Sequence, residues 1–372
     1  MRENKLIMNG DNEYKKIEEL LREMRGSKFM LVCGNSFLSS EAGKYIVSLN
    51  MPHVIFKGFS PNPKYEEIIR GVELYRAAKS DCIIAAGGGS AMDTAKGIKL
   101  YSQMSEGVDY INQPYVNSTV PLIAIPTTAG TGSESTKFCV MYYNGEKQSV
   151  THDCLVPEVA ILLPSILGSL PVYQKKCTML DALCQAIESY WSVNSTDESK
   201  KLAEQAIMLI WENYRDYING ISPSANEKIM LGSNLAGQAI NISATTAPHA
   251  MSYKLTTIYG LPHGHSVAIS LPKVWKYMLY NSEKLNDARG EKYVLDVFAS
   301  IAGLLGCSSV EEAVLSFEKM LAELEIGNPS AKNDRNTELT VLVNSVNVER
   351  LGNNPIMLDR QALNSLYEEI LK

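Results

Sequence analysis

The feature that most constrains the fold is a change of hydrophobic period near Pro164. Before it, short apolar runs alternate with amphipathic segments, which is the pattern of β-α-β units. After it, apolar residues recur at helical spacing with little β-branched alternation. A chain of 372 residues is also long enough for two cores. We therefore expect an α/β dinucleotide-binding domain with a parallel sheet at residues 1–165 and a helical metal-binding domain at residues 166–372.

The pattern also predicts individual elements. We expect strands at residues 29–33, 54–56, 82–86, 122–125 and 159–162. We expect helices at residues 39–49, 64–79, 91–101, 177–191, 200–214, 225–242 and 293–305. Residues 1–24 alternate charged and apolar side chains and are predicted to form a surface helix.

Charge and composition exclude several classes of partner. The formal net charge is −6 and no run of Lys and Arg occurs, which argues against nucleic acid and anionic membranes. No apolar run approaches the ~20 residues that span a bilayer. The seven cysteines include no Cys-x-x-Cys pair, so a disulfide framework is not expected and a cytoplasmic location fits best. The remaining partner class is a small molecule.

A glycine-rich turn is the first candidate site. Gly87, Gly88, Gly89 and Ser90 follow a predicted buried strand and open a predicted helix. Such a turn brings main-chain N–H groups close to a phosphate at a helix N-terminus, although many proteins use it only for tight packing. Asp93 and Lys96 lie in the first turns of that helix, where they are either near a bound cofactor or simply a capping carboxylate and a solvated lysine.

A second polar turn follows another predicted strand. Its residues Thr127, Thr128, Gly130 and Thr131 are expected to close over the same cofactor, although alone they would be an ordinary loop. The predicted strand at 29–33 is followed by Gly34, with no carboxylate to hold ribose hydroxyls and repel the additional phosphate of NADP. NADPH is therefore acceptable, but no arginine nearby enforces it, and the choice between NADH and NADPH stays open.

Four residues of the second half are predicted to bind one divalent metal. Asp181 and Gln185 are four apart, so a helix presents both on one face. His249 and His263, with His265, are three of the five histidines and fall within 17 residues of one another. Each could alternatively be an ordinary core or surface residue. One carboxylate and two imidazoles suit Fe²⁺ or Zn²⁺ and can leave a coordination position open.

These segments together resemble the iron-containing, or group III, alcohol dehydrogenase family from about residue 29 to residue 273, and more loosely to the end. The matching segments, in order, are Gly87 to Lys96, Thr127 to Glu134, Asp181 to Glu188, His249 to Met251 and Leu261 to Gly264. The resemblance implies a Rossmann-like domain beside an all-helical domain, as in dehydroquinate synthase, with the active site in the cleft between them. It also implies a nicotinamide cofactor, NADH or NADPH, and one divalent metal, Fe²⁺ or Zn²⁺.

Two positions depart from the family pattern. Gln185 stands where the family usually has a histidine ligand, and its amide oxygen binds divalent metals less tightly than imidazole does. Tyr253 stands where the family often has a histidine near the nicotinamide. Its phenol either relays a proton to the product oxygen or only packs.

Within the family, the segments around His249 and His263 look like those of the phosphonoacetaldehyde reductase branch. That resemblance implies reduction of phosphonoacetaldehyde to 2-hydroxyethylphosphonate. The phosphonate needs cationic and N–H donors, and Lys254, His265 and Lys137 are candidates, although the commoner role of any single lysine is that of a surface charge.

The expected chemistry is hydride transfer from the nicotinamide to an aldehyde carbonyl polarised by the metal. Tyr253, His265 or water would supply the proton. Three alternatives stay open, namely another short-chain alcohol dehydrogenase of the family, a dehydroquinate-synthase-like lyase that retains its NAD, and a metal-free binding protein. A homodimer is the one assembly considered, and the oligomeric state stays open.

Overall fold

The computed structural model describes residue 4 and residues 6–372, which divide into two compact units. The first consists of Met1–Leu170 and Ser222–Leu231, and the second of Pro171–Ile221 and Gly232–Lys372. The division is not a single cut after residue 165, because the start of a later helix groups with the first unit.

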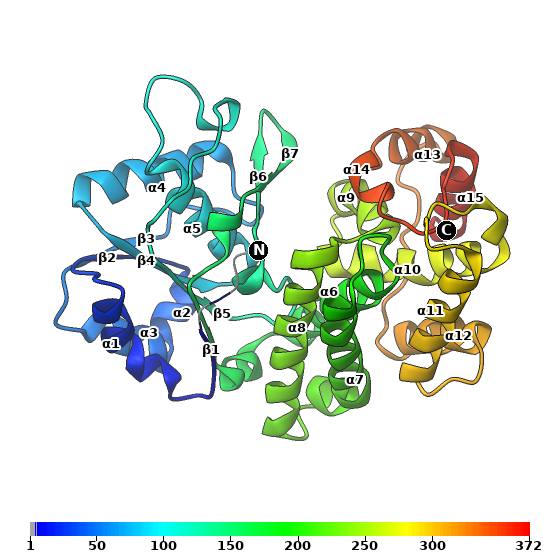
Figure 1. The fold of residues 1–372 in the computed structure, drawn as a ribbon, viewed down its shortest axis with the longest axis horizontal. Coiled ribbons are helices and arrows are strands. Elements are labelled where there is room, and N and C mark those ends of the chain that lie inside the picture. Colours follow the sequence, from blue (N-terminus) through cyan, green and yellow to red (C-terminus); the bar gives the residue numbers. More distant parts are fainter. Residues whose placement is uncertain (1–3, 5) are drawn as a thin grey trace. The chain divides into compact units, whose positions relative to one another are not determined.

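A six-stranded parallel sheet forms the framework of the first unit (Figure 1). The spatial order is β1-β8-β5-β4-β2-β3. The strands are β1 (Leu6–Asn9), β2 (Phe29–Cys33), β3 (His53–Phe56), β4 (Cys82–Gly87), β5 (Leu122–Pro126) and β8 (Val159–Leu162). The helices are α1 (Ile17–Glu23), α2 (Asn35–Ser39), α3 (Glu41–Ser48), α4 (Tyr65–Ala78) and α5 (Gly89–Tyr101). Short 3₁₀ helices lie at Glu13–Lys16, Tyr110–Asn112, Ser133–Ser135, Asp153–Leu155 and Pro164–Ser169.

Helices cover both faces of this sheet, which explains why its central strands are apolar at every position. Successive side chains of a strand point to opposite faces. Met30 and Val32 of β2 therefore join one core with α4 and α5, whereas Phe29, Leu31 and Cys33 join the other with α1, α2 and α3. Figure 1 shows α4 and α5 on one side of the sheet and α1 and α3 on the other.

The predicted fold class is confirmed, and after residue 24 the predicted strands and helices of this unit are all present. The N-terminal prediction was wrong in part. Leu6–Asn9 is strand β1, paired in parallel with Val159–Leu162, and helical structure begins only at Glu13. Residues 1–3 and 5 of that predicted helix lie outside the described residues. A four-residue edge strand whose partner is some 150 residues away leaves no local signal.

The sequence analysis also missed an antiparallel hairpin of β6 (Phe138–Tyr143) and β7 (Glu146–Thr151). Its turn is Asn144-Gly145, and both residues have positive φ, 51° and 80°. Asn-Gly between two strand-like runs is the strongest short hairpin signal, so the sequence did contain the information.

The second unit is helical, as predicted (Figure 1). Its helices are α6 (Val172–Trp191), α7 (Asp197–Asn219), α8 (Pro223–Ser243, whose first residues group with the first unit), α9 (Ala247–Tyr259), α10 (His263–Tyr280), α11 (Glu291–Leu304), α12 (Val310–Glu323), α13 (Arg335–Asn344), α14 (Val348–Leu351) and α15 (Arg360–Ile370). A 3₁₀ helix lies at Ser282–Lys284.

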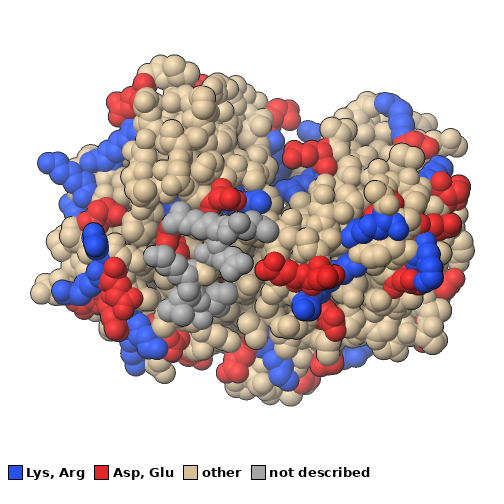
Figure 2. All heavy atoms as spheres, viewed as in Figure 1, with Lys and Arg blue, Asp and Glu red and all other residues tan. Residues whose placement is uncertain are grey.

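Acidic and basic side chains are interspersed over the face of the molecule drawn in Figure 2. Within the described part of the chain, no helix combines the length and apolar character that crossing a bilayer requires. The seven cysteines, all of them described, form no disulfide.

A buried ion pair fastens α5 to the sheet. Lys99 Nζ lies 3.0 and 2.9 Å from the two carboxylate oxygens of Glu158, and both side chains are almost fully buried. Glu158 also accepts a 2.7 Å hydrogen bond from the main-chain N–H of Leu122, at the start of β5.

We predict that Lys99→Ala lowers the free energy of unfolding of the first unit by about 3–5 kcal/mol, because it leaves a buried carboxylate without its counter-charge. Thermal or urea unfolding measures this. The double variant Lys99→Met with Glu158→Gln should recover much of the loss, and Lys44→Ala, which removes an exposed lysine on α3, should unfold like the unaltered protein. Equal stability of Lys99→Ala and Lys44→Ala would contradict the prediction.

Candidate functional site

Three side chains predicted to bind metal converge from three helices of the second unit. Asp181 is on α6, His249 on α9, and His263 is the first residue of α10. One ligand atom from each lies within 4.8 Å of the others. Asp181 Oδ1 is 3.4 Å from His249 Nε2 and 3.8 Å from His263 Nε2. A carboxylate and two imidazoles at these distances form the donor set of a divalent metal.

Gly264 allows the start of α10 to approach α6 this closely. A Cβ atom at Gly264 would lie 1.9 Å from the carbonyl oxygen of Cys177 and 2.8 Å from Cβ of Asp181. Any other residue would push the two helices apart and move His263 away from Asp181.

The burial of this cluster supports the fit to a cation. Gln185 follows Asp181 by one helical turn, and its side chain is buried. Gln185 Oε1 has no hydrogen-bond partner among the described residues, and His249 Nε2 faces only the carboxylate of Asp181, at a long 3.4 Å. A buried polar atom left in this way costs about 1–3 kcal/mol, which binding to a metal would offset. Coordination by Gln185 stays a prediction.

Glu188, which the sequence analysis did not single out, orients His249. Its Oε1 lies 2.5 Å from His249 Nδ1, and its Oε2 accepts hydrogen bonds from the N–H and hydroxyl of Thr246 at 2.8 and 3.0 Å. Burial lowers the pKa of His249, but the negative charges of Glu188 and Asp181 outweigh burial and raise it to about 9. Because Nδ1 donates to Glu188, Nε2 is the nitrogen directed at the cluster. The sequence did contain a signal for this role, because Glu188 follows Asp181 by seven residues and therefore lies on the same face of the helix.

Tyr253 lies against the same cluster. Its ring stacks on the ring of His263, with centroids 6.2 Å apart. Burial raises the pKa of its phenol, and a hydrogen bond and the charge of the Arg350 guanidinium partly offset that rise. Arg350 belongs to α14, which packs against α9. The sequence analysis missed Arg350 because it is 97 residues from Tyr253.

The structure gives His265 a different role from the two that were predicted. Its Nδ1 lies 2.9 Å from the hydroxyl of Tyr173, and its Nε2 lies 2.8 Å from the carbonyl oxygen of Gly327. Burial lowers the pKa of His265, which favours the neutral ring. With both nitrogens engaged, His265 fastens α10 to its surroundings, and this geometry supports neither proton transfer nor anion binding.

The other two predicted anion-binding residues belong to different units. Lys254 is next to Tyr253 on α9, so its side chain leaves the helix about 100° away from the phenol. Lys137 belongs to the first unit, where its Nζ lies 3.9 Å from Asp153 Oδ1.

In the first unit, the two predicted cofactor loops lie side by side. They follow β4 and β5, which are neighbours paired Gly87 with Pro126, and the N–H of Thr127 donates to the carbonyl of Gly87 at 2.9 Å. A Cβ at Gly88 would lie 3.4 Å from Thr128 Oγ1, and one at Gly89 would lie 3.0 Å from Thr131 Cγ2.

Gly87 is required by backbone geometry. Its φ is +158°, and a Cβ there would lie 2.6 Å from Cβ of Ala91. The absence of side chains leaves the main chain accessible at the N-terminus of α5, a 13-residue helix, as a pyrophosphate requires. Ser90 also touches a neighbouring loop, because its hydroxyl accepts from the N–H of Asn62 at 3.1 Å. Gly130 is buried in the second loop.

Lys96 and Asp93 support these loops from the interior. Lys96 is fully buried and donates to Ser133 Oγ (3.0 Å), to the carbonyl and hydroxyl of Thr136 (2.7 and 3.1 Å) and to the carbonyl of Phe138 (2.9 Å). Burial lowers the pKa of Lys96 to about 8 and raises that of Asp93 to about 6, and each residue's charge opposes the shift in the other. Because its ammonium group is engaged by these residues, Lys96 holds the segment after the second loop in place, instead of contacting a cofactor directly as predicted.

The order of strands also locates a nucleotide site. The chain runs from β2 outward to β3 and then returns to β4 on the other side of β2, so the winding reverses between β2 and β4. Ligands of open parallel sheets bind at the carboxyl ends of the strands beside such a reversal. Gly87 is the last residue of one of these strands, and Gly34 follows the other.

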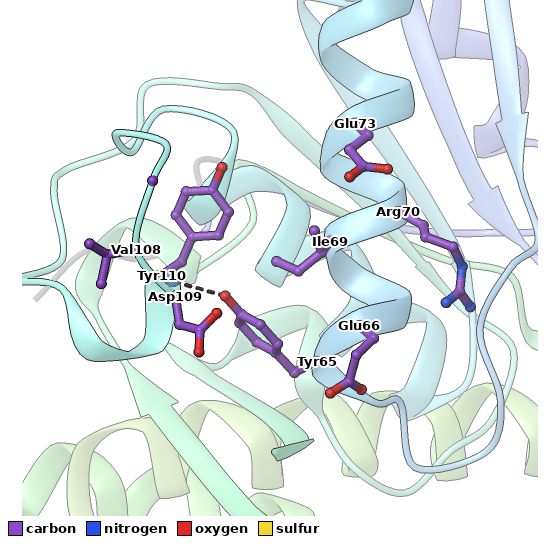
Figure 3. A pocket seen from close by; sticks show the side chains of 9 residues that line it. Tyr65, Glu66, Ile69, Arg70, Glu73, Val108, Asp109 and Tyr110 are labelled. Atoms are coloured by element: carbon purple, nitrogen blue, oxygen red, sulfur yellow. Dashed lines mark hydrogen bonds between the residues drawn. The ribbon is translucent and has the colours of Figure 1, made fainter. Parts of the chain in front are cut away.

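A surface pocket of about 500 Å³ lies elsewhere in the first unit (Figure 3). It is lined by α4 and the loop at 107–110, where the hydroxyl of Tyr65 accepts from the N–H of Tyr110 at 2.8 Å. None of the predicted site residues lines it, so it is separate from the nucleotide loops.

Comparison with known proteins gives matches over both halves of the chain. Residues 4–164 match the family described as iron-containing alcohol dehydrogenase, and residues 176–371 match the C-terminal part of the Fe-containing alcohol dehydrogenase family.

An aldehyde-alcohol dehydrogenase from Streptococcus pneumoniae is 34% identical over 73% of this chain. That relative is longer, and the match covers only 33% of its length. A phosphonoacetaldehyde reductase from Streptomyces viridochromogenes is 31% identical over 79% of this chain and 77% of that protein. A sulfoacetaldehyde reductase from Bifidobacterium kashiwanohense, solved in complex with NAD⁺, has a TM-score of 0.88 and 27% identity, covering 98% of this chain and 96% of that chain.

We predict that Gln185→His strengthens metal binding, because an imidazole replaces a neutral amide oxygen at a buried position beside Asp181. Competition with a chelator should show roughly tenfold tighter retention of Fe²⁺ or Zn²⁺, which corresponds to about 1.4 kcal/mol. Gln174→His, at an exposed position on the same helix, is the control. Unchanged retention in Gln185→His would show that residue 185 does not face the metal.

Proposed function

The chain belongs to the iron-containing alcohol dehydrogenase family, and from this premise we propose that it reduces an aldehyde to a primary alcohol with a reduced nicotinamide cofactor. The observation that carries the proposal is the convergence of Asp181, His249 and His263. A divalent metal held by these residues, with Gln185 beside them, would supply Lewis acidity, and the nicotinamide would supply hydride.

The protein's own residues prepare this site in three ways. Glu188 holds the ring of His249 so that Nε2 faces Asp181. The burial of Asp181, Gln185 and His249 strengthens the electrostatic interactions among these side chains. Tyr253 lies against His263, and its raised pKa keeps the phenol protonated at neutral pH. We propose that this phenol donates a hydrogen bond to the oxygen of the substrate.

For the substrate we propose phosphonoacetaldehyde, which is reduced to 2-hydroxyethylphosphonate. Support comes from the resemblance around His249 and His263 and from the similarity to a phosphonoacetaldehyde reductase. Further support comes from Arg350, whose guanidinium interacts with Tyr253. A guanidinium presents a planar pair of N–H donors whose spacing matches two oxygens of a phosphonate.

We predict that the purified protein consumes NADH or NADPH stoichiometrically with an added aldehyde and that Asp181→Ala abolishes both metal retention and turnover, with activity reduced by at least about a hundredfold. Absorbance at the nicotinamide band and elemental analysis measure these quantities. Asp216→Ala, which removes an exposed carboxylate on α7, should behave like the unaltered protein. Full activity in Asp181→Ala would defeat the proposal, and turnover without net cofactor consumption would favour a lyase that retains its NAD.

We also predict that Arg350→Ala raises KM for phosphonoacetaldehyde by about 10–100-fold, because it removes a charge-assisted bond of about 1.5–3 kcal/mol. KM for a neutral aldehyde such as propanal should change little, and kcat for both should be nearly retained. Arg360→Ala removes an exposed arginine on α15 and serves as the control. An equal effect on the anionic and the neutral aldehyde would exclude Arg350 as the anion-binding residue.

A further inference from the structure

A lysine from the end of β3 lies beside the loop that follows β2. Lys57 is the first residue after β3, and its Nζ donates to Asn35 Oδ1 at 3.1 Å. Although burial raises the pKa of Cys33 to about 11, the positive charge of Lys57 acts in the opposite direction, which places that charge near the end of β2. Lys57 is exposed and therefore accessible to a ligand.

This position is where the sheet would place the adenosine ribose of a dinucleotide. The winding reverses between β2 and β4, and Cys33 pairs with Ala86 at the carboxyl ends of these strands. A pyrophosphate on the glycine turn after β4 therefore has the loop after β2 as its neighbour. In such sheets a carboxylate beside the ribose selects NAD, whereas a cation accommodates the 2′-phosphate of NADP.

The loop after β2 offers donors and no carboxylate. Its residues are Gly34, Asn35 and Ser36, and apart from the neighbouring residues a Cβ at Gly34 would find only Ser36 Oγ, at 4.0 Å, so no side chain crowds this position. The sequence suggested that nothing enforces NADPH, because Lys57 is 22 residues from Asn35. The parallel pairing of β2 with β3 brings the two together.

We propose that Lys57, with Asn35 and Ser36, binds the 2′-phosphate of the cofactor, so that NADPH rather than NADH is the reductant. The proposal rests on the proposed function only in requiring a dinucleotide on the first unit. An ammonium group that already touches an amide can form a charge-assisted bond to a phosphate without large rearrangement. The glycine at position 34 removes the repulsion that would oppose it.

The test is nucleotide binding by isothermal titration calorimetry, with full-length protein and without substrate. Adenosine 2′,5′-bisphosphate carries the 2′-phosphate, and adenosine 5′-monophosphate lacks it. We expect the bisphosphate to bind at least about tenfold more tightly. Lys57→Ala should remove most of this advantage while leaving binding of the monophosphate unchanged. Lys44→Ala, at an exposed position on α3, should preserve the advantage.

A second variant distinguishes a change in charge at the binding site from a loss of folding. Gly34→Asp places a carboxylate at the ribose position and should reverse the preference, weakening the bisphosphate and retaining the monophosphate. Equal affinity of the unaltered protein for both nucleotides, or an advantage that survives Lys57→Ala, would overturn this inference and leave the proposed function standing. Failure to bind either nucleotide would overturn both.

Discussion

The hydrogen bond between Glu188 and His249 is the interaction on which the geometry of the candidate metal site depends. It joins a carboxylate of α6 to an imidazole of α9 inside the second unit and fixes which ring nitrogen faces Asp181. The bond is itself supported, because Thr246 donates twice to Glu188 and accepts from the indole N–H of Trp191 at 2.8 Å. A ligand oriented in this way loses little freedom when a metal binds, which is why such supporting shells affect affinity strongly.

In the first unit, the candidate cofactor loops have an accessible main chain that the surrounding structure holds in one conformation. Parallel pairing brings the loops after β2, β4 and β5 to one edge of the sheet. The buried ammonium of Lys96 then joins α5 to the segment from Ser133 to Phe138, because its three N–H groups are shared among four oxygens at 2.7–3.1 Å. Glycine residues have few conformational restraints of their own. The turn at Gly87 to Gly89 can still keep one conformation, because the fully buried Lys96 fixes the segments that pack beside it.

Sequence patterns predicted those features that depend on residues close together in the chain. The central strands and the helices follow from hydrophobic period, and the i,i+4 spacing of Asp181 and Gln185 indicated one helix face. Strand β1 was missed because its only partner is distant in sequence, and the roles of His265 and Lys96 were misjudged because their partners, Gly327 and Thr136, cannot be read from spacing. Lys57 was missed for the same reason. Pairing between distant side chains decides these roles, and only the folded chain reveals it.

The most direct test of the central claim is anomalous X-ray diffraction from crystals of the active protein, with data collected on both sides of the iron and zinc absorption edges. The account predicts one anomalous peak in the second unit, within bonding distance of Asp181, His249 and His263. An active protein whose metal is bound by other residues, or which turns over with no metal in the crystal, would contradict it.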